Sequence, residues 1–184
     1  MAGHTIRLVG DPVLRQRAAE VSDIDGKLAQ LADEMVTTMY DAPGMGLAAP
    51  QIGVRKRVFV YDVGEGPLTL INPTIVESDG EWAYEEGCLS VPGLSWEIVR
   101  PKLVHLTGLD LDGNQLSIEA DEILARCFQH EMDHLDGILL LERLDAETRK
   151  TALKTIHELG IGPSFDPEVA PARRGSGGGG FSLR

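Results

Sequence analysis

Apolar residues repeat at the spacing of an α-helix in three segments of the chain. The first segment runs from Asp25 to Asp41, and its apolar residues form one stripe, which predicts an amphipathic helix packed on the core. The stripe consists of Ile24, Leu28, Leu31, Met35 and Met39. The second segment runs from Asp121 to Leu141, with Gly137 as an expected stop signal within it, and the third runs from Asp145 to Leu159. An aspartate at the start of the third segment and a glycine after its end are typical helix boundaries.

Shorter apolar runs with turn residues between them lie in the middle of the chain and predict strands. The predicted strands are Val58–Val63, Leu68–Ile71, Thr74–Glu77, Trp82–Glu86 and Leu103–Leu109. Turns are expected at Asn72-Pro73 and Asp79-Gly80, and their close spacing favours antiparallel sheets over parallel βαβ units. A short helix is expected from Asp11 to Glu20. The segment from Gly44 to Gly53 is rich in small residues and predicts a turn that leads into an extended stretch.

This order of elements predicts an α+β fold, in which antiparallel β-sheets pack around a central helix, with N-terminal helices and a C-terminal helix. A chain of 184 residues with 42% hydrophobic composition is long enough for one domain, which we place at residues 1–160. Residues 161–184 are rich in proline and glycine, and we expect them to form a disordered tail.

Composition and charge narrow the classes of function. The chain has no run of about twenty apolar residues, so no membrane-spanning segment is expected. Its first residues carry charges and Pro12 where a signal peptide would be apolar, which favours a cytoplasmic location. There are 17 basic and 29 acidic side chains, and the net charge of −12 argues against DNA as a partner, because nucleic acids bind positive surfaces.

The second predicted helix carries His130 and His134 four residues apart, with Glu131 next to the first histidine. On a helix this spacing puts both imidazoles on one face, roughly 6 Å apart along the axis, so that they can bind one metal ion. Glu131 points about 100° away from His130 and can reach a water molecule on that ion without binding the ion itself. The pattern is therefore typical of metal-assisted hydrolysis.

The two cysteines differ in their relation to these histidines. Cys127 precedes His134 by seven residues, about 10 Å along a helix, so it cannot easily share an ion with both histidines and is interpreted as a small buried residue. Cys88 lies in a strand-like run broken by glycine and proline, where a bend could present its thiolate. Two histidines leave a metal site short of at least one protein ligand, and Cys88 is the candidate.

Three separated motifs resemble, in this order, the signature of the peptide deformylases. They are Gly44-Met45-Gly46-Leu47-Ala48-Ala49-Pro50-Gln51, Glu86-Gly87-Cys88-Leu89-Ser90 and Gln129-His130-Glu131-Met132-Asp133-His134-Leu135. The resemblance covers about residues 5–160. It implies a metal-dependent hydrolase that removes the formyl group from the N-terminal formyl-methionine of newly made polypeptides and releases formate.

The resemblance also implies a role for each motif residue. The implied metal ligands are Cys88, His130 and His134. The metal lowers the pKa of a water molecule, and Glu131 accepts the proton of this water and later gives it to the departing amine. The side-chain amide of Gln51 and the backbone N–H of Leu89 are the expected donors to the oxyanion. Gly46 is expected to let the peptide substrate approach and pair as an added strand.

The motifs indicate the identity of the metal and of the partners less directly than they indicate the reaction. A cysteine with two histidines suits Zn²⁺, Fe²⁺, Co²⁺ or Ni²⁺, and the resemblance implies one divalent ion, ferrous iron in the cell. The expected partners are formyl-methionyl nascent peptides and, through them, the ribosome. Four basic residues gather around the last predicted helix, namely Arg143, Arg149, Lys150 and Lys154. They form either a ribosome contact or an ordinary solvated helix face.

Several charged residues near the motifs have two interpretations. Arg126 lies four residues before His130, where the family usually carries an aliphatic residue that lines the methionine pocket. Either the arginine stem lines this pocket with its charge at the rim, or the pocket is reshaped. Glu86 and Asp133 either orient a ligand imidazole or form salt bridges with an arginine such as Arg100, and we favour the salt bridges.

Two other functions fit part of the pattern. A zinc endopeptidase shares the His-Glu-x-x-His helix, but Leu140 stands where one class has a third histidine. The class that uses a downstream glutamate could use Glu158, but it leaves Cys88 unexplained. A non-catalytic, metal-stabilised binding module would close all four ligand positions, and the sequence offers no obvious fourth ligand near the other three.

Overall fold

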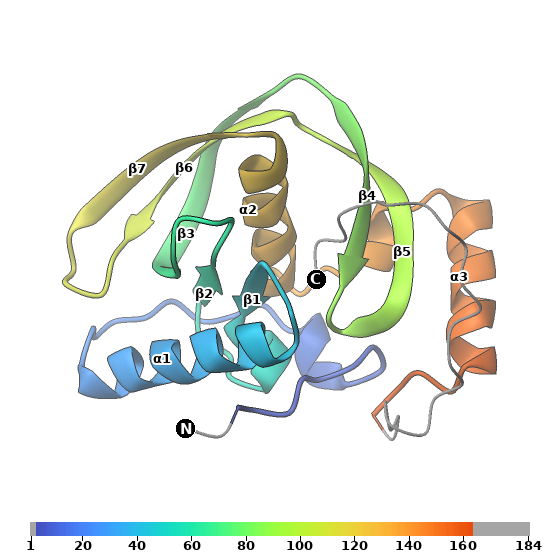
Figure 1. Ribbon diagram of the computed structural model, residues 1–184, viewed down its shortest axis with the longest axis horizontal. Coiled ribbons are helices and arrows are strands. Elements are labelled where there is room, and N and C mark those ends of the chain that lie inside the picture. Colours follow the sequence, from blue (N-terminus) through green and yellow to red (C-terminus); the bar gives the residue numbers. More distant parts are fainter. Residues whose placement is uncertain (1–2, 164–184) are drawn as a thin grey trace.

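The computed structural model describes residues 3–163, and these residues form two sheets around one buried helix (Figure 1). The α-helices are α1 (Gly26–Asp41), α2 (Glu122–Leu135) and α3 (Ala146–Glu158). The strands are β1 (Gly46–Ala48), β2 (Val58–Tyr61), β3 (Leu68–Asp79), β4 (Trp82–Cys88), β5 (Val91–Arg100), β6 (Leu103–Leu109) and β7 (Gln115–Asp121). Short 3-10 helices are η1 (Pro12–Arg15), η2 (Ala49–Ile52) and η3 (Leu140–Arg143). The predicted α+β fold with antiparallel sheets and a C-terminal helix is confirmed.

The larger sheet has five strands in the order β1-β2-β3-β6-β7, and each neighbouring pair is antiparallel. β1 therefore lies at one edge of this sheet. The smaller sheet consists of β4 and β5, whose pairing runs from Trp82 and Arg100 to Cys88 and Val91. α2 lies between the two sheets, α1 crosses beside β1 and β2, and α3 lies on the outer side of β5 (Figure 1).

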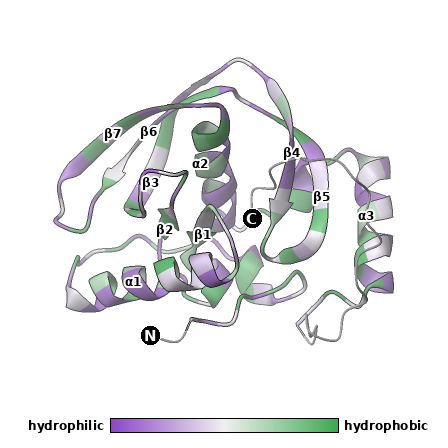
Figure 2. Cartoon of the chain, in the orientation of Figure 1, coloured by the Kyte–Doolittle hydropathy of each residue, from purple (hydrophilic) through white to green (hydrophobic). Residues whose placement is uncertain are grey.

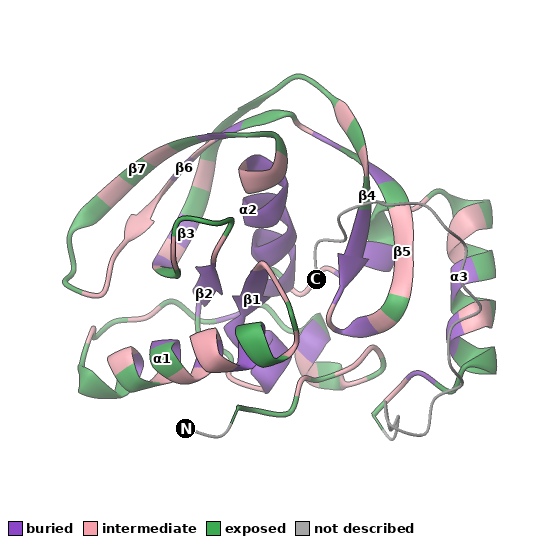
Figure 3. Cartoon of the chain, in the orientation of Figure 1, coloured by how far each residue is buried: buried purple, intermediate pink, exposed green. Residues whose placement is uncertain are grey.

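The central helix α2 is buried although many of its residues are polar. Figure 2 shows hydrophilic positions along this helix, and Figure 3 shows the same part of the helix buried. All residues from Ala125 to Leu135 are buried. Phe128 and Leu135 pack with Phe59 and Leu70 of the larger sheet. Because buried polar groups need hydrogen-bond partners, the polar side chains of α2 must find theirs inside the protein.

The predicted helix boundaries are confirmed for α1 and α3. Asp25 is the N-cap of α1 and accepts a hydrogen bond from the backbone N–H of Leu28 at 2.9 Å. Asp145 is the N-cap of α3 and accepts from the N–H groups of Glu147 and Thr148, each at 3.0 Å. These caps satisfy N–H groups that have no partner within the helix.

Two helix predictions are wrong in extent. α2 ends at Leu135, whereas the helix was expected to continue to Leu141. Gly137 has a φ of 74°, a conformation that ends an α-helix, and the chain turns there before η3. Between Asp11 and Glu20 the only helical turn is η1.

The strand predictions are correct in kind but incomplete. The expected turn at Asn72-Pro73 is wrong, because β3 continues through it with a register shift between Ile71 and Thr74. Asn72 has a φ of 49°, and its side chain bonds both the N–H and the C=O of Val21, so the irregularity becomes a bulge. β5 was not expected, because Pro92-Gly93 and polar residues interrupt its apolar alternation. β7 was also missed, although Leu116, Ile118 and Ala120 alternate with polar residues along it.

No helix in the described part of the chain has the length and apolar character needed to cross a membrane. Ile161, the first residue of the expected tail, is buried, and its N–H donates to the carbonyl of Ile156 at 3.0 Å. The rest of the predicted tail, from residue 164 onward, lies outside the described residues.

Candidate metal centre

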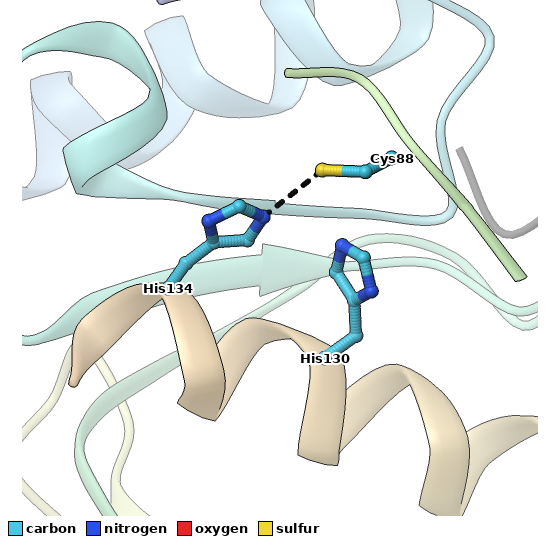
Figure 4. A group of neighbouring side chains, drawn as sticks. All are labelled: Cys88, His130 and His134. Atoms are coloured by element: carbon cyan, nitrogen blue, oxygen red, sulfur yellow. Dashed lines mark hydrogen bonds between the residues drawn. The ribbon is translucent and has the colours of Figure 1, made fainter. Parts of the chain in front are cut away.

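α2 and the end of β4 bring three ligand-type side chains together. His130 and His134 lie on one face of α2, and Cys88 is the last residue of β4 (Figure 4). Their ligand atoms all lie within 4.8 Å of one another, and Sγ of Cys88 is 3.2 Å from Nε2 of His134. All three side chains are buried. The structure thus brings together the three residues that the sequence marks as metal ligands.

The electrostatics of this cluster favour a thiolate. Burial raises the pKa of Cys88, but the imidazoles of His134 and His130 outweigh it and hold this pKa well below its usual range. The backbone N–H of Ser90 also donates to Sγ at 3.4 Å. A thiolate is the form of cysteine that binds metals. A thiolate with two imidazoles fits Zn²⁺, Fe²⁺, Co²⁺ or Ni²⁺.

Glu86 is fully buried behind the ligands and binds three side chains. Its Oε1 lies 2.6 Å from Nδ1 of His130 and accepts from Nη2 of Arg100, also at 2.6 Å. Its Oε2 accepts from Nε of Arg100 and from Nη1 of Arg126, each at 2.8 Å. Because an ionised carboxylate only accepts hydrogen bonds, Nδ1 of His130 carries the proton and its Nε2 is free to bind a metal. Glu86 therefore orients an imidazole in addition to forming the favoured salt bridges.

Asp133 has the salt-bridge role that we favoured. Its carboxylate accepts from Nη1 of Arg100 at 2.9 Å and from Nε of Arg143 at 3.0 Å. Arg143 belongs to η3 rather than to α3, and its guanidinium is held by Asp133. Of the four basic residues considered for a ribosome contact, Arg143 is therefore already paired with Asp133, although it is exposed.

Glu131 lies beside the cluster but is not one of the three ligand-type groups. Its side chain is buried, and its Oε2 has no hydrogen-bond partner among residues 3–163. Burial raises the pKa of Glu131 to about 7, although His130 and His134 oppose this shift. Gly46 packs against it so closely that a Cβ on Gly46 would lie 2.3 Å from Oε1. A carboxylate with this pKa can exchange protons near neutral pH.

Gln51 lies in η2, close to Cys88. Its Oε1 accepts from the backbone N–H of Ala48 at 2.8 Å, which fixes the direction of the amide. Its Nε2 points toward the cluster, 3.9 Å from Sγ of Cys88 and 3.3 Å from Oγ of Ser90. Leu89 directly follows Cys88, so the backbone N–H of Leu89 lies close to the cysteine. Both groups that we expected to donate to an oxyanion are thus next to the candidate ligands.

The guanidinium of Arg126 is buried, so of the two interpretations of this residue, the one that places its charge at a pocket rim is wrong. Burial lowers the pKa of Arg126, while Glu86 opposes this shift. Cys127 is also buried, and burial raises the pKa of its thiol well above the usual value. Its Sγ lies 3.7 Å from the carbonyl oxygen of Met45, and Cys127 is not part of the ligand cluster. This agrees with its interpretation as a small buried residue.

The ligand set of an endopeptidase is not assembled. Glu158 is exposed near the end of α3, where it pairs with Lys154 at 3.7 Å. In the part of the chain that the structure describes, the cluster that could hold a metal contains Cys88, His130 and His134 and no fourth His, Cys, Asp or Glu. Three protein ligands are typical of catalytic metal sites, which keep one position open.

The sequence did not indicate the partnership of Arg126 with Glu86 or the contacts of Ser90. Forty residues separate Arg126 from Glu86, and their contact depends on how β4 packs on α2. A signal was present, because an arginine among the apolar residues of a buried helix needs a carboxylate partner. Ser90 lies within the second motif and approaches both Gln51 and Cys88.

Comparisons with known proteins agree with this site. A family model described as polypeptide deformylase matches residues 4–150. The peptide deformylase of Agathobacter rectalis is 52% identical over 145 residues, which cover 79% of this chain and 92% of the relative. That of Acidothermus cellulolyticus is 50% identical over 158 residues, or 86% of this chain and 88% of the relative. A crystal structure of a peptide deformylase from Legionella pneumophila has a TM-score of 0.82 at 40% identity and covers 86% of this chain and 96% of that one.

Proposed function

This chain belongs to the polypeptide deformylase family, and we propose that the cluster of Cys88, His130 and His134 is its catalytic metal site. The protein is a metal-dependent hydrolase that removes the N-formyl group from formylated polypeptides. One observation carries the assignment of the site. The buried carboxylate of Glu131, with its Oε2 unpartnered among the described residues, lies next to a buried thiolate and two imidazoles.

The protein side chains divide the reaction between them. A bound divalent metal would polarise the formyl oxygen and lower the pKa of water at the site. The oxygen of a water molecule attacks the formyl carbon, and Glu131 takes a proton from this water. When the bond between this carbon and the peptide nitrogen breaks, Glu131 gives the proton to the departing amine, and formate is released. The raised pKa of Glu131, about 7, supports both proton transfers.

Gln51 and Leu89 stabilise the oxyanion that forms on the formyl oxygen. The amide Nε2 of Gln51 is directed toward Cys88 because its Oε1 is fixed by the N–H of Ala48. The backbone N–H of Leu89 follows the cysteine ligand and is the second donor. Donors aimed at a developing oxyanion contribute on the order of 3 kcal/mol each to catalysis.

The substrate binds along β1. This strand is at the edge of the larger sheet and pairs with β2 on one side. A peptide can add to such an edge as a further strand, with main-chain hydrogen bonds that do not depend on its sequence. Gly46 in β1 places the backbone beside Glu131, so a peptide paired here brings its formyl end to the carboxylate.

Ferrous iron is the proposed metal in the cell, with Zn²⁺, Co²⁺ and Ni²⁺ as ions that the same ligands accept. One thiolate and two imidazoles do not select sharply among these ions, so availability decides occupancy. Metal analysis of protein purified without oxygen tests this assignment, with the same protein purified in air as the control. A preparation that holds only zinc under both conditions, with full activity, would contradict the choice of iron.

The substrates are formyl-methionyl nascent peptides, and we infer a cytoplasmic location because such chains are made there. Lys150 and Lys154 are exposed on α3 and could contact the ribosome, whereas Arg143 is held by Asp133. The net charge of −12 supports the absence of DNA as a partner. Co-sedimentation of the protein with ribosomes, compared with a Lys150→Glu/Lys154→Glu variant, tests the contact.

Replacement of the proposed cysteine ligand tests the site. Cys88→Ala should lose both bound metal and formate release, because two imidazoles alone hold a divalent ion weakly. Cys127→Ala is the matched control and should retain the metal, because its thiol lies outside the cluster. Metal content by elemental analysis, together with formate release from formyl-Met-Ala, decides the outcome. Full metal content in Cys88→Ala would contradict the ligand set.

A further inference from the structure

Arg126 connects the carboxylate behind the metal ligands to a pair of aromatic rings. Its Nη1 donates to Oε2 of Glu86 at 2.8 Å and to the carbonyl of Ile98 at 3.0 Å. Its Nη2 donates to the carbonyl of Trp82 at 2.5 Å. The guanidinium carbon lies 5.0 Å from the ring centroid of Trp82 and 5.8 Å from that of Tyr84. These two rings are stacked, with centroids 4.6 Å apart.

The second ring, Tyr84, lines a hollow that Met45 of the first motif also lines. This hollow has a volume of about 410 Å³, and its lining is mostly apolar, with two acidic residues at Asp121 and Glu122 beside Met45, Val63, Tyr84, Ile123 and Leu124. Met45 directly precedes Gly46, the residue that packs on Glu131. The carbonyl of Met45 is also 3.7 Å from the thiol of Cys127, one turn before Glu131 on α2. An apolar side chain in this hollow would therefore contact Tyr84 while the rest of its peptide reaches Glu131.

The contacts form one continuous path. Tyr84 and Trp82 cover the guanidinium of Arg126, Arg126 holds Oε2 of Glu86, and Oε1 of Glu86 lies 2.6 Å from Nδ1 of His130. Arg126 is 1% exposed and Glu86 is 0% exposed, so water does not screen these interactions. A shift of either ring changes the position of the guanidinium, and the carboxylate that orients His130 must follow it.

Stability alone does not account for an arginine at this position. Glu86 already has a two-point salt bridge with Arg100, through Nε at 2.8 Å and Nη2 at 2.6 Å. The Nε of Arg126 is buried without a hydrogen-bond partner among the described residues, which is unfavourable. A second buried guanidinium on one carboxylate is costly to desolvate and is often replaceable by an apolar residue. This arrangement is expected where the arginine acts through its partner.

We propose that Arg126 is a positioning residue that couples the hollow at Tyr84 to the metal ligand His130 through Glu86. The inference rests on the proposed function, since it takes His130 as a metal ligand and a formylated peptide as the substrate. The occupant of the hollow is the apolar side chain of the first residue of that peptide. Filling the hollow fixes the rings, the guanidinium and the carboxylate, and the imidazole is then held in one orientation.

The test uses the full chain loaded with Co²⁺, whose visible absorption spectrum reports the geometry of its ligands. The probes are the peptides Met-Ala-Ser and Gly-Ala-Ser, which have the same backbone and differ in the side chain that would enter the hollow. At saturating peptide the wild-type spectrum should change more with Met-Ala-Ser than with Gly-Ala-Ser. In Arg126→Met, which keeps an unbranched apolar stem but removes the guanidinium and its charge, the two peptides should give the same spectrum.

Arg126→Met should also release Co²⁺ to a chelator about ten times faster than the wild type, the effect typical of losing a group that holds a metal ligand in place. Its kcat should fall more than its KM rises, and Arg126→Lys should recover part of the loss. Arg57→Met is the matched control, because Arg57 is buried and paired with Asp136 at 2.7 Å but does not contact Glu86. Its spectrum and Co²⁺ release should match those of the wild type.

A second variant keeps the test decisive if Arg126→Met does not fold. Tyr84→Leu leaves the salt bridge of Arg126 with Glu86 in place, and Tyr84 is only partly buried. It should abolish the spectral difference between the two peptides. The proposal is overturned if either variant keeps the wild-type difference, or if the wild type shows none. Formate release by the wild type distinguishes these results from a failure of the proposed function, because that failure would abolish formate release itself.

Discussion

Gly46 packs directly on Glu131, and a Cβ added to Gly46 would lie 2.3 Å from Oε1 of the carboxylate. The same Cβ would lie 3.0 Å from Sγ of Cys127. Two elements that are far apart in sequence, β1 and α2, therefore meet with no space between the backbone of one and the functional carboxylate of the other. The glycine of the first motif is needed for this contact as well as for the approach of a substrate.

We predict that Gly46→Ala lowers formate release about 100-fold, because displacement of a catalytic group by about 1 Å has an effect of this size. The free energy of unfolding should fall by about 1 to 3 kcal/mol through overpacking. Gly26→Ala is the control, since a Cβ there meets nothing within 4 Å and should leave the rate unchanged. Steady-state kinetics measure the rate, and urea unfolding measures the stability. If Gly46→Ala releases formate as fast as the wild type, the prediction is contradicted, because Glu131 would then tolerate the displacement.

Glu86→Gln should weaken metal binding by about 10-fold to 100-fold, because a neutral amide orients His130 less firmly than a carboxylate does. Stability should also fall, by on the order of 3 kcal/mol, since Arg100 and Arg126 lose a charged buried partner. Competition with a chelator measures the metal affinity. Glu85→Gln, at the exposed neighbouring position, is the control. Unchanged metal affinity and turnover in Glu86→Gln would rule out the orienting role.

Gln51→Ala should lower kcat by about 100-fold to 1,000-fold while KM changes little, because an oxyanion donor acts mainly in the transition state. The variant should also lose about 1 kcal/mol of stability, since the N–H of Ala48 loses its acceptor. Gln129→Ala is the matched control, because this buried amide donates to the carbonyls of Pro101 and Ala125 and is not directed at the ligand cluster. An equal loss of kcat in both variants would show that general destabilisation, and not the loss of an oxyanion donor, lowers kcat in Gln51→Ala.

Acid stability should depend in part on Glu142. Burial raises the pKa of Glu142, but hydrogen bonds from the N–H of Leu139 and from Arg15 outweigh it and lower this pKa below its usual value. A pKa lowered in the folded state contributes stability that is present above the unfolded pKa and is lost as the pH falls through the folded pKa. Glu142→Gln should therefore lose less stability than the wild type between about pH 5 and pH 3. Urea unfolding across this pH range measures the free energy of unfolding, with Glu81→Gln as the exposed control. If the free energy of unfolding falls equally with pH in Glu142→Gln and in the wild type, the prediction is contradicted.

Local signals predicted the elements whose boundaries are set locally. α1 and α3 were predicted because Asp25 and Asp145 cap them through hydrogen bonds to their own first turns. The end of α2 was placed too late, because apolar residues continue past Leu135 although Gly137 turns the chain. β5 was not predicted, since its pairing with β4 across the hairpin, rather than apolar alternation, makes it a strand.

The candidate site also combines features that local sequence predicts with features that depend on tertiary packing. His130 and His134 could be assigned together because four residues bring side chains to one helix face. Cys88 and Gln51 came from motifs, and the structure brings them to the histidines across β4 and η2. The partners of Glu86 could not be assigned from the sequence, because Arg100 and Arg126 reach it from β5 and α2 only when these elements pack together. Contacts of this kind depend on the tertiary structure.

Formate release by the wild type and by Glu131→Gln, each with its metal content determined, is the most direct test of the proposed mechanism. The substrate is formyl-Met-Ala-Ser, and equal amounts of formate and free amine should appear with the wild type. Glu131→Gln should retain the metal, because Glu131 is not among the clustered ligand groups, and should lose about 100-fold to 10,000-fold in rate. Formate release at the wild-type rate by metal-loaded Glu131→Gln would contradict the role of Glu131, and no release by the metal-loaded wild type would contradict the function itself.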